Sequence, residues 1–244
     1  MFREEQGRLK SLSHVEGNLK FDLAPEPRLI SLGQGWKARL DARPIVLGAV
    51  TREGEEASLL AAWRAIAVPR PLLVIVPRHP QRFEAVAELI AGSGFSLSRR
   101  SAWSEGPPEG AASADVWLGD SMQEIPAWYA LADAALLGGS FAPLGGQNLI
   151  EAAACGCPLV MGPHTFNFAE AAEQPLVAGV AIRVAAMNAG VAEAVRLAAD
   201  PRRREPLAQS ALAFADEHCG AAQRMAARFA EAMPIAARPH RPTG

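Results

Sequence analysis

The chain has 244 residues, half of them hydrophobic and a fifth charged, with a formal net charge of −2 at pH 7. This length suits one large domain or two small ones, and the composition is typical of a globular protein with a sizeable core. Because the charge is close to neutral, no basic surface for a nucleic-acid duplex is expected, and nucleic acid is not a predicted partner. The sequence shows no signal peptide and no apolar run long enough to span a bilayer, so by itself it predicts a soluble cytoplasmic domain.

Strand and helix patterns alternate along most of the chain. Strands are expected at residues 45–50, 72–76, 95–99, 116–118, 132–137, 159–161 and 180–184. Helices are expected at 34–40, 51–67, 81–91, 121–131, 149–155, 168–177 and 191–200, with further helices between 201 and 233. The first turn of the second helix carries Glu53, Glu55 and Glu56, where the helix dipole favours acidic side chains. This alternation predicts an α/β fold with a Rossmann-like, doubly wound parallel sheet.

The pattern divides the chain into three parts. Residues 1–44 include a short strand at Val15–Asp22 and a connector rich in proline and glycine, and are expected to lead into the main domain. Residues 45–200 carry the alternating elements, and 201–244 are expected to form C-terminal helices and a frayed, proline-rich tail. Within the domain, the Pro-, Gly- and Ala-rich stretch 101–114 is expected to be a mobile surface loop.

The strongest indication of a ligand site lies between Leu136 and Phe168. The strand at 132–137 ends on a glycine pair at 138–139, a second pair follows at 145–146, and a short helix leads to the next strand. Parallel sheets bind ligands at the carboxyl edge of their strands, and glycines let the main chain approach a ligand closely. The stretch has no Lys, no Arg and no P-loop pattern, so a phosphate here would rest on main-chain N–H groups and the helix start. The alternative is a glycine-rich turn that only connects strand and helix.

Small and polar residues of this loop are the candidate ligand contacts. Ser140 offers a hydroxyl and a main-chain N–H group to a phosphate, while Gln147 and Asn148 offer side-chain amides. The candidates on the two walls of the loop are Gly139, Ser140, Gly145, Gly146, Gln147 and Asn148.

Glu151 stands near the start of the helix that follows. If Asn148 is the N-cap, Glu151 occupies the third helical position and completes a capping box that satisfies main-chain N–H groups. In the alternative, its carboxylate lies at the mouth of the cleft and accepts hydrogen bonds from two sugar hydroxyls. Position alone does not separate these two roles.

Arg78 and His79 directly follow the strand at 72–76 and share the expected carboxyl edge. An arginine held between Pro77 and Pro80 can clamp a phosphate with two N–H groups. The alternative is an exposed loop arginine. His79 is equally compatible with a ligand contact and with an ordinary loop residue.

Two further clusters favour structural roles. Cys155, Cys157 and Cys219 form no even framework and lack a second pair at zinc spacing, so buried thiols in a reducing compartment are expected, without a metal site. The arginine run at 202–204 favours a solvated helix face over contact with anionic lipid.

Longer motifs resemble those of a known family. The run GGSFAPLGGQNLIEAAACGCPLVMGPHTFNF, residues Gly138–Phe168, closely resembles the donor-site region of bacterial Kdo transferases, which add 3-deoxy-D-manno-octulosonic acid (Kdo) to lipid A precursors. Family motifs are also matched by GNLKFD at Gly17–Asp22 and by PRHP at Pro77–Pro80. The resemblance extends from about Glu4 to the C-terminal helices and covers the second half of a full-length family member.

The resemblance implies the C-terminal, CMP-Kdo-binding half of a GT-B glycosyltransferase, in which two Rossmann-like domains face each other across a cleft. The full enzyme would transfer Kdo with inversion to a lipid A precursor during lipopolysaccharide biosynthesis. It would act at the cytoplasmic face of the inner membrane, through peripheral or anchored association, and without a cofactor. The general base is a glutamate of the family's N-terminal domain, which also binds the acceptor. No catalytic residue is therefore expected in this chain, which should bind donor without turnover.

The same resemblance assigns roles to individual residues. Arg78 is expected at the donor phosphate and Glu151 at the ribose hydroxyls. Asn167, with His164 beside it, is expected in the cleft toward the sugar.

The chain also departs from the family pattern. Gln147 stands where many members have histidine, and because glutamine does not titrate near neutrality, an acid–base role at this position is in doubt. Phe166 and Phe168 of the family-specific run are expected to pack in the core.

Two other functions remain open from the sequence. One is the donor domain of a GT-B enzyme that uses a UDP-sugar, such as UDP-N-acetylglucosamine. The other is a stand-alone nucleotide-binding module.

Overall fold

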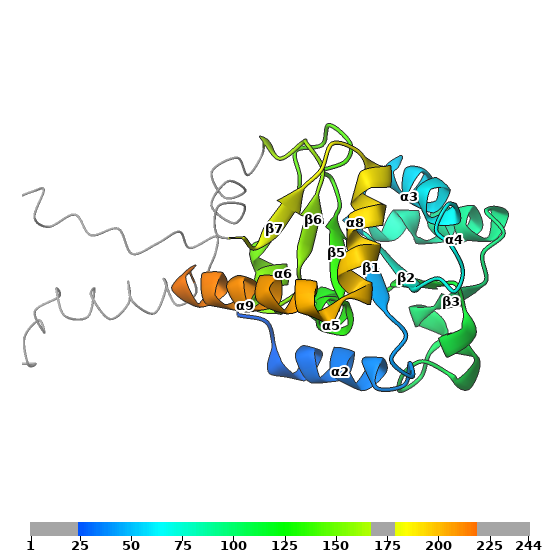
Figure 1. Cartoon of the computed structure of the whole chain (residues 1–244). Helices are drawn as coiled ribbons and strands as arrows, with labels where there is room; N and C mark the ends of the chain where they lie inside the picture. The colour runs from blue at the N-terminus through cyan, green and yellow to red at the C-terminus, as the bar shows by residue number, and fades with distance from the viewer. Residues whose placement is uncertain (1–23, 167–178, 219–244) are drawn as a thin grey trace, which may run out of the picture. The chain divides into compact units, whose positions relative to one another are not determined.

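The computed structural model describes residues 24–166 and 179–218, and within them Ala24–Ala215 form one compact unit (Figure 1). The strands are β1 Ile45–Thr51, β2 Leu72–Pro77, β3 Leu97–Arg99, β4 Val116–Leu118, β5 Ala134–Leu137, β6 Leu159–Met161 and β7 Ala181–Arg183. The α-helices are α2 Pro27–Lys37, α3 Glu55–Arg64, α4 Phe83–Gly92, α5 Ile125–Leu131, α6 Ile150–Ala154, α8 Met187–Ala199 and α9 Pro201–His218. Short 3-10 helices are η2 Pro80–Arg82, η3 Arg100–Ala102 and η4 Glu109–Ser113. Among these helices, none has both the length and the hydropathy needed to cross a membrane.

The seven strands form one sheet in the order β3-β4-β2-β1-β5-β6-β7. Every neighbouring pair is parallel. The chain winds outward from β1 through β2 to β3 and β4, then returns to place β5 on the other side of β1. This confirms the predicted doubly wound α/β fold. Its topological switch point lies between β1 and β5, where such sheets form a ligand crevice at their carboxyl edge.

One face of the sheet is covered by α3, α4 and α8. Figure 1 shows α8 lying across β5 and β1, both of which it contacts. These helices bury large apolar side chains in one core cluster, among them Leu59, Trp63, Ile90, Val191 and Leu197. Full burial of a side chain of this size contributes about 1.5–3 kcal/mol, so this layer supports the fold that presents the loops.

A second packed layer brings α2 against α5 and contains four indoles. The ring centroids of Trp36 and Trp128 lie 4.7 Å apart, and Trp103 lies 5.5 Å from Trp36 and 4.7 Å from Trp117. The guanidinium of Arg100 stacks 5.3 Å from the Trp36 ring. This cluster ties α2, which precedes the first strand, to the body of the domain.

Residues 101–114 were predicted to be a mobile surface loop, and the structure corrects this. Trp103 is buried within the indole cluster. Nη1 of Arg43 donates to the carbonyl oxygens of Ala112 at 2.8 Å and Ala114 at 2.7 Å. The stretch is therefore anchored to the fold at two points.

Several helices begin at a different residue than predicted, and proline or glycine residues lie at their starts. α2 begins earlier than expected, with Pro27 in its first turn. α3 begins at Glu55 because Gly54, with φ of 89°, turns the chain before it. α5 begins later than expected, with Pro126 in its first turn, a position that proline tolerates. The strand expected at Val15–Asp22, the helix at 168–177 and the tail lie outside the described residues.

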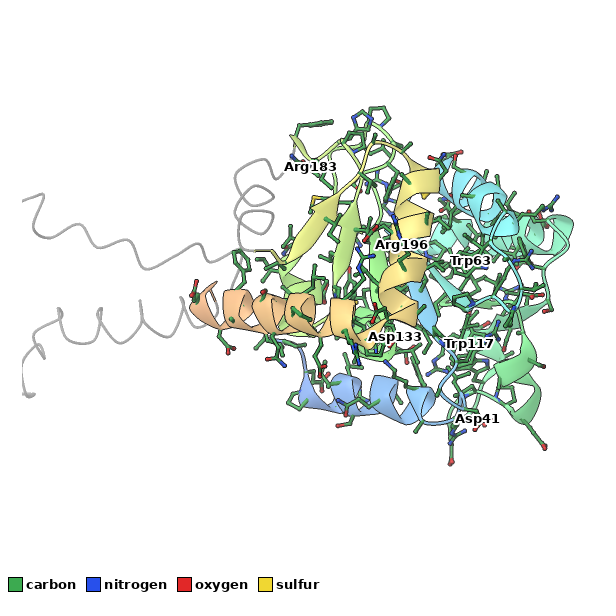
Figure 2. The ribbon with its side chains drawn as sticks, viewed as in Figure 1. Asp41, Trp63, Trp117, Asp133, Arg183 and Arg196 are labelled. Atoms are coloured by element: carbon green, nitrogen blue, oxygen red, sulfur yellow. The ribbon has the colours of Figure 1, made fainter. Side chains whose placement is uncertain are left out.

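A buried carboxylate organises the amino edge of the sheet. Asp133, 4% exposed, accepts hydrogen bonds from Nζ of Lys37 at 2.7 Å and from the N–H of Ile45 at 2.9 Å, and it pairs with Arg204 at 3.1 Å. Figure 2 shows Asp133 near α9, at the end of the sheet away from Arg183. Because the carboxylate is paired and hydrogen-bonded, its burial is tolerated.

The arginine run at 202–204 was predicted to form a solvated helix face, and Arg202 and Arg203 are exposed, whereas Arg204 is half-buried. Arg204 pairs with Asp133, and Nη2 of Arg203 lies 3.1 Å from Glu193 of α8. Two of the three arginines therefore fasten α9 to the rest of the domain.

Candidate functional site

The end of β1 holds together the loops that follow its two neighbours in the sheet. The carbonyl oxygen of Thr51 accepts a hydrogen bond from the N–H of Arg78, which follows β2, at 2.9 Å. The carbonyl oxygen of Ala49 accepts one from Gly138, which follows β5, at 2.8 Å. The predicted arginine loop and the predicted glycine-rich loop are thus brought to one edge of the sheet.

The glycine-rich loop is shaped by close main-chain contacts. A Cβ atom at Gly138 would lie 2.3 Å from the carbonyl oxygen of Val50, so only glycine fits there. Gly139, Gly145 and Gly146 have φ of 72°, 86° and 78°, a region that favours glycine. The N–H of Gly146 donates to the carbonyl of Gly139 at 2.7 Å, which closes the loop between the two glycine pairs.

Glu55, at the start of α3, binds the main chain of this loop. Its carboxylate accepts hydrogen bonds from the N–H groups of Gly139 at 2.7 Å, Phe141 at 3.0 Å and Ala142 at 3.3 Å. Main-chain N–H groups of the glycine-rich loop were expected to hold a phosphate, but these three already bind a buried carboxylate and are therefore not free to do so.

Ser140 was predicted to offer its hydroxyl to a phosphate, but the side chain is fully buried. Its Oγ donates to the carbonyl of Leu137 and accepts a hydrogen bond from the N–H of Gly162 at 2.9 Å. The hydroxyl therefore links β5 to the loop after β6. Any contact of Ser140 with a ligand would have to use its main-chain N–H group.

Further along the loop, main-chain donors remain free within the described part of the chain. The N–H groups of Gly145, Gln147 and Asn148 have no hydrogen-bond partner there. Gln147 and Asn148 are half-buried at the start of α6. If the loop binds an anion, these later N–H groups are the ones that can serve it.

Glu151 is the second residue of α6, whose N-cap is Leu149. The N–H of Ile150 donates to Oδ1 of Asn148 at 3.0 Å, and Glu151 makes no hydrogen bond with any described residue. The capping-box alternative is therefore wrong. Burial raises the pKa of the Glu151 carboxyl, and the nearby positive charge of Arg78 lowers it in part. A half-buried carboxylate without a hydrogen-bond partner is suited to accept bonds from ligand hydroxyls.

Arg78 and His79 are both exposed at the carboxyl end of β2. Arg78 forms no ion pair with a described residue, although its charge acts on Glu151. Glu151 thus lies within the electrostatic influence of Arg78, although the two residues are far apart in the sequence. His79 precedes the η2 turn and makes no side-chain hydrogen bond within the described residues.

The loop after β6 contacts the glycine-rich loop. The N–H of His164 donates to the carbonyl of Ser140 at 3.0 Å, and Oγ1 of Thr165 accepts from Nη2 of Arg183 at 3.1 Å. Phe166 is 62% exposed, so the prediction that it packs in the core is wrong. Asn167, a predicted sugar contact, lies outside the described residues, as does Phe168.

Of the two described cysteines, Cys157 is a buried thiol, as predicted, whereas Cys155 is only half-buried. Cys157 is 1% exposed and Cys155 is half-buried, and both are free. Burial raises the pKa of Cys155 to about 12 and that of Cys157 further, so neither is a thiolate at neutral pH. In the described part of the chain, no three His, Cys, Asp or Glu side chains gather as metal ligands.

Sequence reasoning missed two residues at this edge. Glu55 was interpreted only as a helix-dipole residue, and Arg52 was not considered. Arg52 is half-buried directly after β1 and forms no side-chain hydrogen bond or ion pair with a described residue. The rule that selected Arg78, a residue directly after a buried parallel strand, also applies to Arg52.

Comparisons of sequence connect the chain with sugar-transferring enzymes. A family described as Glycosyl transferase-like matches residues 123–230. The 3-deoxy-D-manno-octulosonic acid transferase of Bordetella pertussis is 44% identical over 215 residues, which are 86% of this chain and 49% of the relative. That of Haemophilus influenzae is 40% identical over 170 residues, 67% of this chain and 38% of the relative. The chain thus spans about half, or less, of the length of these relatives.

Comparisons of structure agree. The C-terminal CMP-Kdo binding domain of WaaA from Acinetobacter baumannii is 29% identical, with a TM-score of 0.70 over 76% of this chain and 97% of that domain. Anabaena Alr3699/HepE in complex with UDP-glucose is 16% identical, with a TM-score of 0.55 over 84% of this chain and 53% of that protein, which shows a shared fold alone. The fold is that of one half of a GT-B glycosyltransferase, and by sequence and structure the chain belongs with the C-terminal domain of the 3-deoxy-D-manno-octulosonic acid transferases.

Proposed function

We propose that this chain binds CMP-Kdo as the donor domain of a Kdo transferase. One observation carries the proposal: Glu151, half-buried and without a hydrogen-bond partner in the described residues, lies in the electrostatic reach of Arg78 at the carboxyl edge of the sheet. A nucleoside monophosphate sugar presents the complementary groups, ribose hydroxyls and a phosphate. The relationship to a CMP-Kdo binding domain supports the same ligand.

In this proposal each residue acts through its chemistry. The Glu151 carboxylate accepts hydrogen bonds from the ribose hydroxyls. Arg78 binds the donor phosphate with its guanidinium and offsets the charge that grows on CMP as it departs. The N–H groups of Gly145, Gln147 and Asn148, which have no partner among the described residues, add further donors.

The rest of the reaction lies beyond the described site. We propose that the full-length enzyme transfers Kdo with inversion to a lipid A precursor at the cytoplasmic face of the inner membrane. The acceptor site and the general base belong, in this proposal, to residues outside this chain. Asn167 contributes to the sugar side, and Gln147, which does not titrate near neutrality, serves only as a hydrogen-bonding group.

Calorimetric titration of the chain with CMP and with UDP tests the ligand class. The proposal expects CMP to bind at least about tenfold more tightly, a difference of about 1.4 kcal/mol. A clear preference for UDP would instead indicate the donor domain of an enzyme that uses a UDP-sugar. Absence of binding by both nucleotides at millimolar concentration would contradict the donor-site proposal altogether.

A transfer assay tests whether catalysis needs residues outside this chain. With CMP-Kdo and a lipid A precursor, we expect these 244 residues alone to produce no transferred Kdo. Detectable transfer by this chain would show that it holds a general base, and would overturn that part of the proposal.

A further inference from the structure

We propose that Glu55 is a positioning residue of the donor site, whose carboxylate serves as a built-in anion that fixes the glycine-rich loop. The inference rests on the donor-binding function proposed above. It assigns a role to a residue that contacts neither Arg78 nor Glu151 and that acts on the ligand only through the loop.

The geometry around Glu55 is that of an anion site made from main chain. The side chain is 2% exposed. Oε2 accepts hydrogen bonds from the N–H groups of Arg52 at 2.9 Å and Gly139 at 2.7 Å. Oε1 accepts from Phe141 at 3.0 Å and Ala142 at 3.3 Å. Neighbouring N–H groups that converge in this way form a concavity that binds anions.

The place of this contact in the fold explains its importance. Glu55 begins the helix after β1, and the loop it holds follows β5. The crevice between these two strands is the switch point at which doubly wound folds bind ligands. There, a carboxylate of the chain itself occupies the N–H groups that in other folds cradle phosphate. The donor phosphate is consequently directed toward Arg78 and the later N–H groups of Gly145, Gln147 and Asn148.

The next residue holds the other wall. Glu56 is fully buried, and its carboxylate accepts hydrogen bonds from Oγ1 of Thr51 at 3.0 Å and from Nη2 of Arg82 at 3.1 Å. The carbonyl of Thr51 in turn accepts the N–H of Arg78 at 2.9 Å. Consecutive glutamates thus fix the two loops that carry the proposed phosphate contacts, one loop each.

The sharpest variant is Glu55→Gln. Whichever way the new amide is oriented, its NH2 group replaces an oxygen that accepted two main-chain N–H groups, so two donors lose their acceptor and face another donor. We expect CMP affinity, measured by calorimetry, to fall at least tenfold, and amide hydrogen exchange across residues 139–142 to become faster. Glu53→Gln is the matched control. Glu53 is two residues earlier, its side chain is 87% exposed, and among the described residues it pairs only with Arg82, at 3.6 Å, so CMP affinity should stay within twofold of wild type.

Chemical rescue separates positioning from general damage to the fold. In Glu55→Ala, sodium formate at tens of millimolar should restore at least half of the lost CMP affinity, whereas sodium chloride at equal ionic strength should not. A fold that was simply weakened would not recover with a small carboxylate.

The outcomes distinguish this inference from the proposed function. If wild type binds no CMP, the proposed function fails and the inference falls with it. If wild type binds CMP and folded Glu55→Gln binds it equally well, the donor site stands and the positioning role is overturned. If Glu55→Gln does not fold, the formate experiment decides: rescue supports the role, and absence of rescue overturns it.

Discussion

The surroundings of Glu151 favour binding of a ligand over the stability of the free chain. Burial raises the pKa of the Glu151 carboxyl, and Arg78 offsets this effect only in part. A carboxylate placed half in the protein without hydrogen bonds is destabilising, because its lost hydration is not replaced. Ligand-binding sites often retain such groups. The unfavourable burial of the Glu151 carboxylate is therefore consistent with a role in binding a ligand.

Glu151→Gln should therefore separate binding from stability. Because the pKa of Glu151 is raised in the folded state, the folded state holds the proton more tightly than the unfolded one. Its contribution to stability is then greatest below the ordinary pKa of 4.5 and is lost as pH rises through the folded value. We expect the variant to melt at the same or a higher temperature than wild type at pH 7, with the difference shrinking below pH 4.5. CMP affinity should fall at least about tenfold, since hydrogen bonds to a charged group are lost. A lower melting temperature with unchanged affinity would contradict this account.

Arg78→Ala tests the phosphate contact. Charge-assisted hydrogen bonds to phosphate contribute about 1.5–3 kcal/mol, so CMP affinity should fall at least about tenfold, with little change in melting temperature because the side chain is exposed. Arg202→Ala, an exposed arginine of α9, is the control and should bind CMP as wild type does. If calorimetry shows equal affinity for Arg78→Ala and wild type, the phosphate lies elsewhere.

At the scale of residues, the sequence identified candidates but not their partners. Arg78 was selected because it follows a strand at the expected edge of the sheet, and Glu151 because it lies near the start of a helix there. Glu55 was interpreted by local context alone, and the loop N–H group of Gly139 that it binds is 84 residues away. Ser140 was likewise assigned to a ligand because nothing in its neighbourhood predicts the contact with Gly162. Such long-range hydrogen bonds carry no local sequence signal.

At the scale of elements, the contact of α2 with α5 offers a stability test. A Cβ atom at Gly33 would lie 2.0 Å from the carbonyl oxygen of Ala127, so this helix pair packs backbone against backbone. Gly33→Ala should destabilise the domain by about 1–3 kcal/mol, as overpacking does. Gly35→Ala, in the same helix with nothing within 4 Å, should be neutral or stabilise by about 0.5–1 kcal/mol. Thermal denaturation of both variants measures the difference, and equal loss from both would contradict the close packing.

Elements were predicted best where burial is continuous. β1, β2 and β6 lie where their apolar runs predicted them. A strand that is covered on both faces is a continuous run of apolar residues, which is easy to recognise in the sequence. Helix ends were predicted less well, since they depend on single residues such as Gly54 and on tertiary contacts. The anchoring of residues 101–114 was missed for the same reason: it depends on Arg43 and on the indole cluster, both remote in sequence.

At the scale of the whole molecule, alternation of elements was enough to predict a parallel α/β sheet, but not the order of its strands. Local patterns do not state which strands become neighbours, and the placement of β5 beside β1 creates the crevice. The proposed donor site therefore depends on the strand order, which brings the loops after β1, β2, β5 and β6 to one edge of the sheet. Because the chain spans about half of its curated relatives, we assign catalysis, as part of the same proposal, to a longer protein that includes this domain.

A crystal structure of the chain with bound CMP tests the central claim most directly. The account predicts the phosphate within hydrogen-bond distance of the Arg78 guanidinium, the ribose hydroxyls on the Glu151 carboxylate, and Glu55 still bound to the loop beneath. Nucleotide bound at the opposite edge of the sheet, near Asp133 and Lys37, or a phosphate that displaces Glu55 from the N–H groups of Gly139 and Phe141, would contradict it.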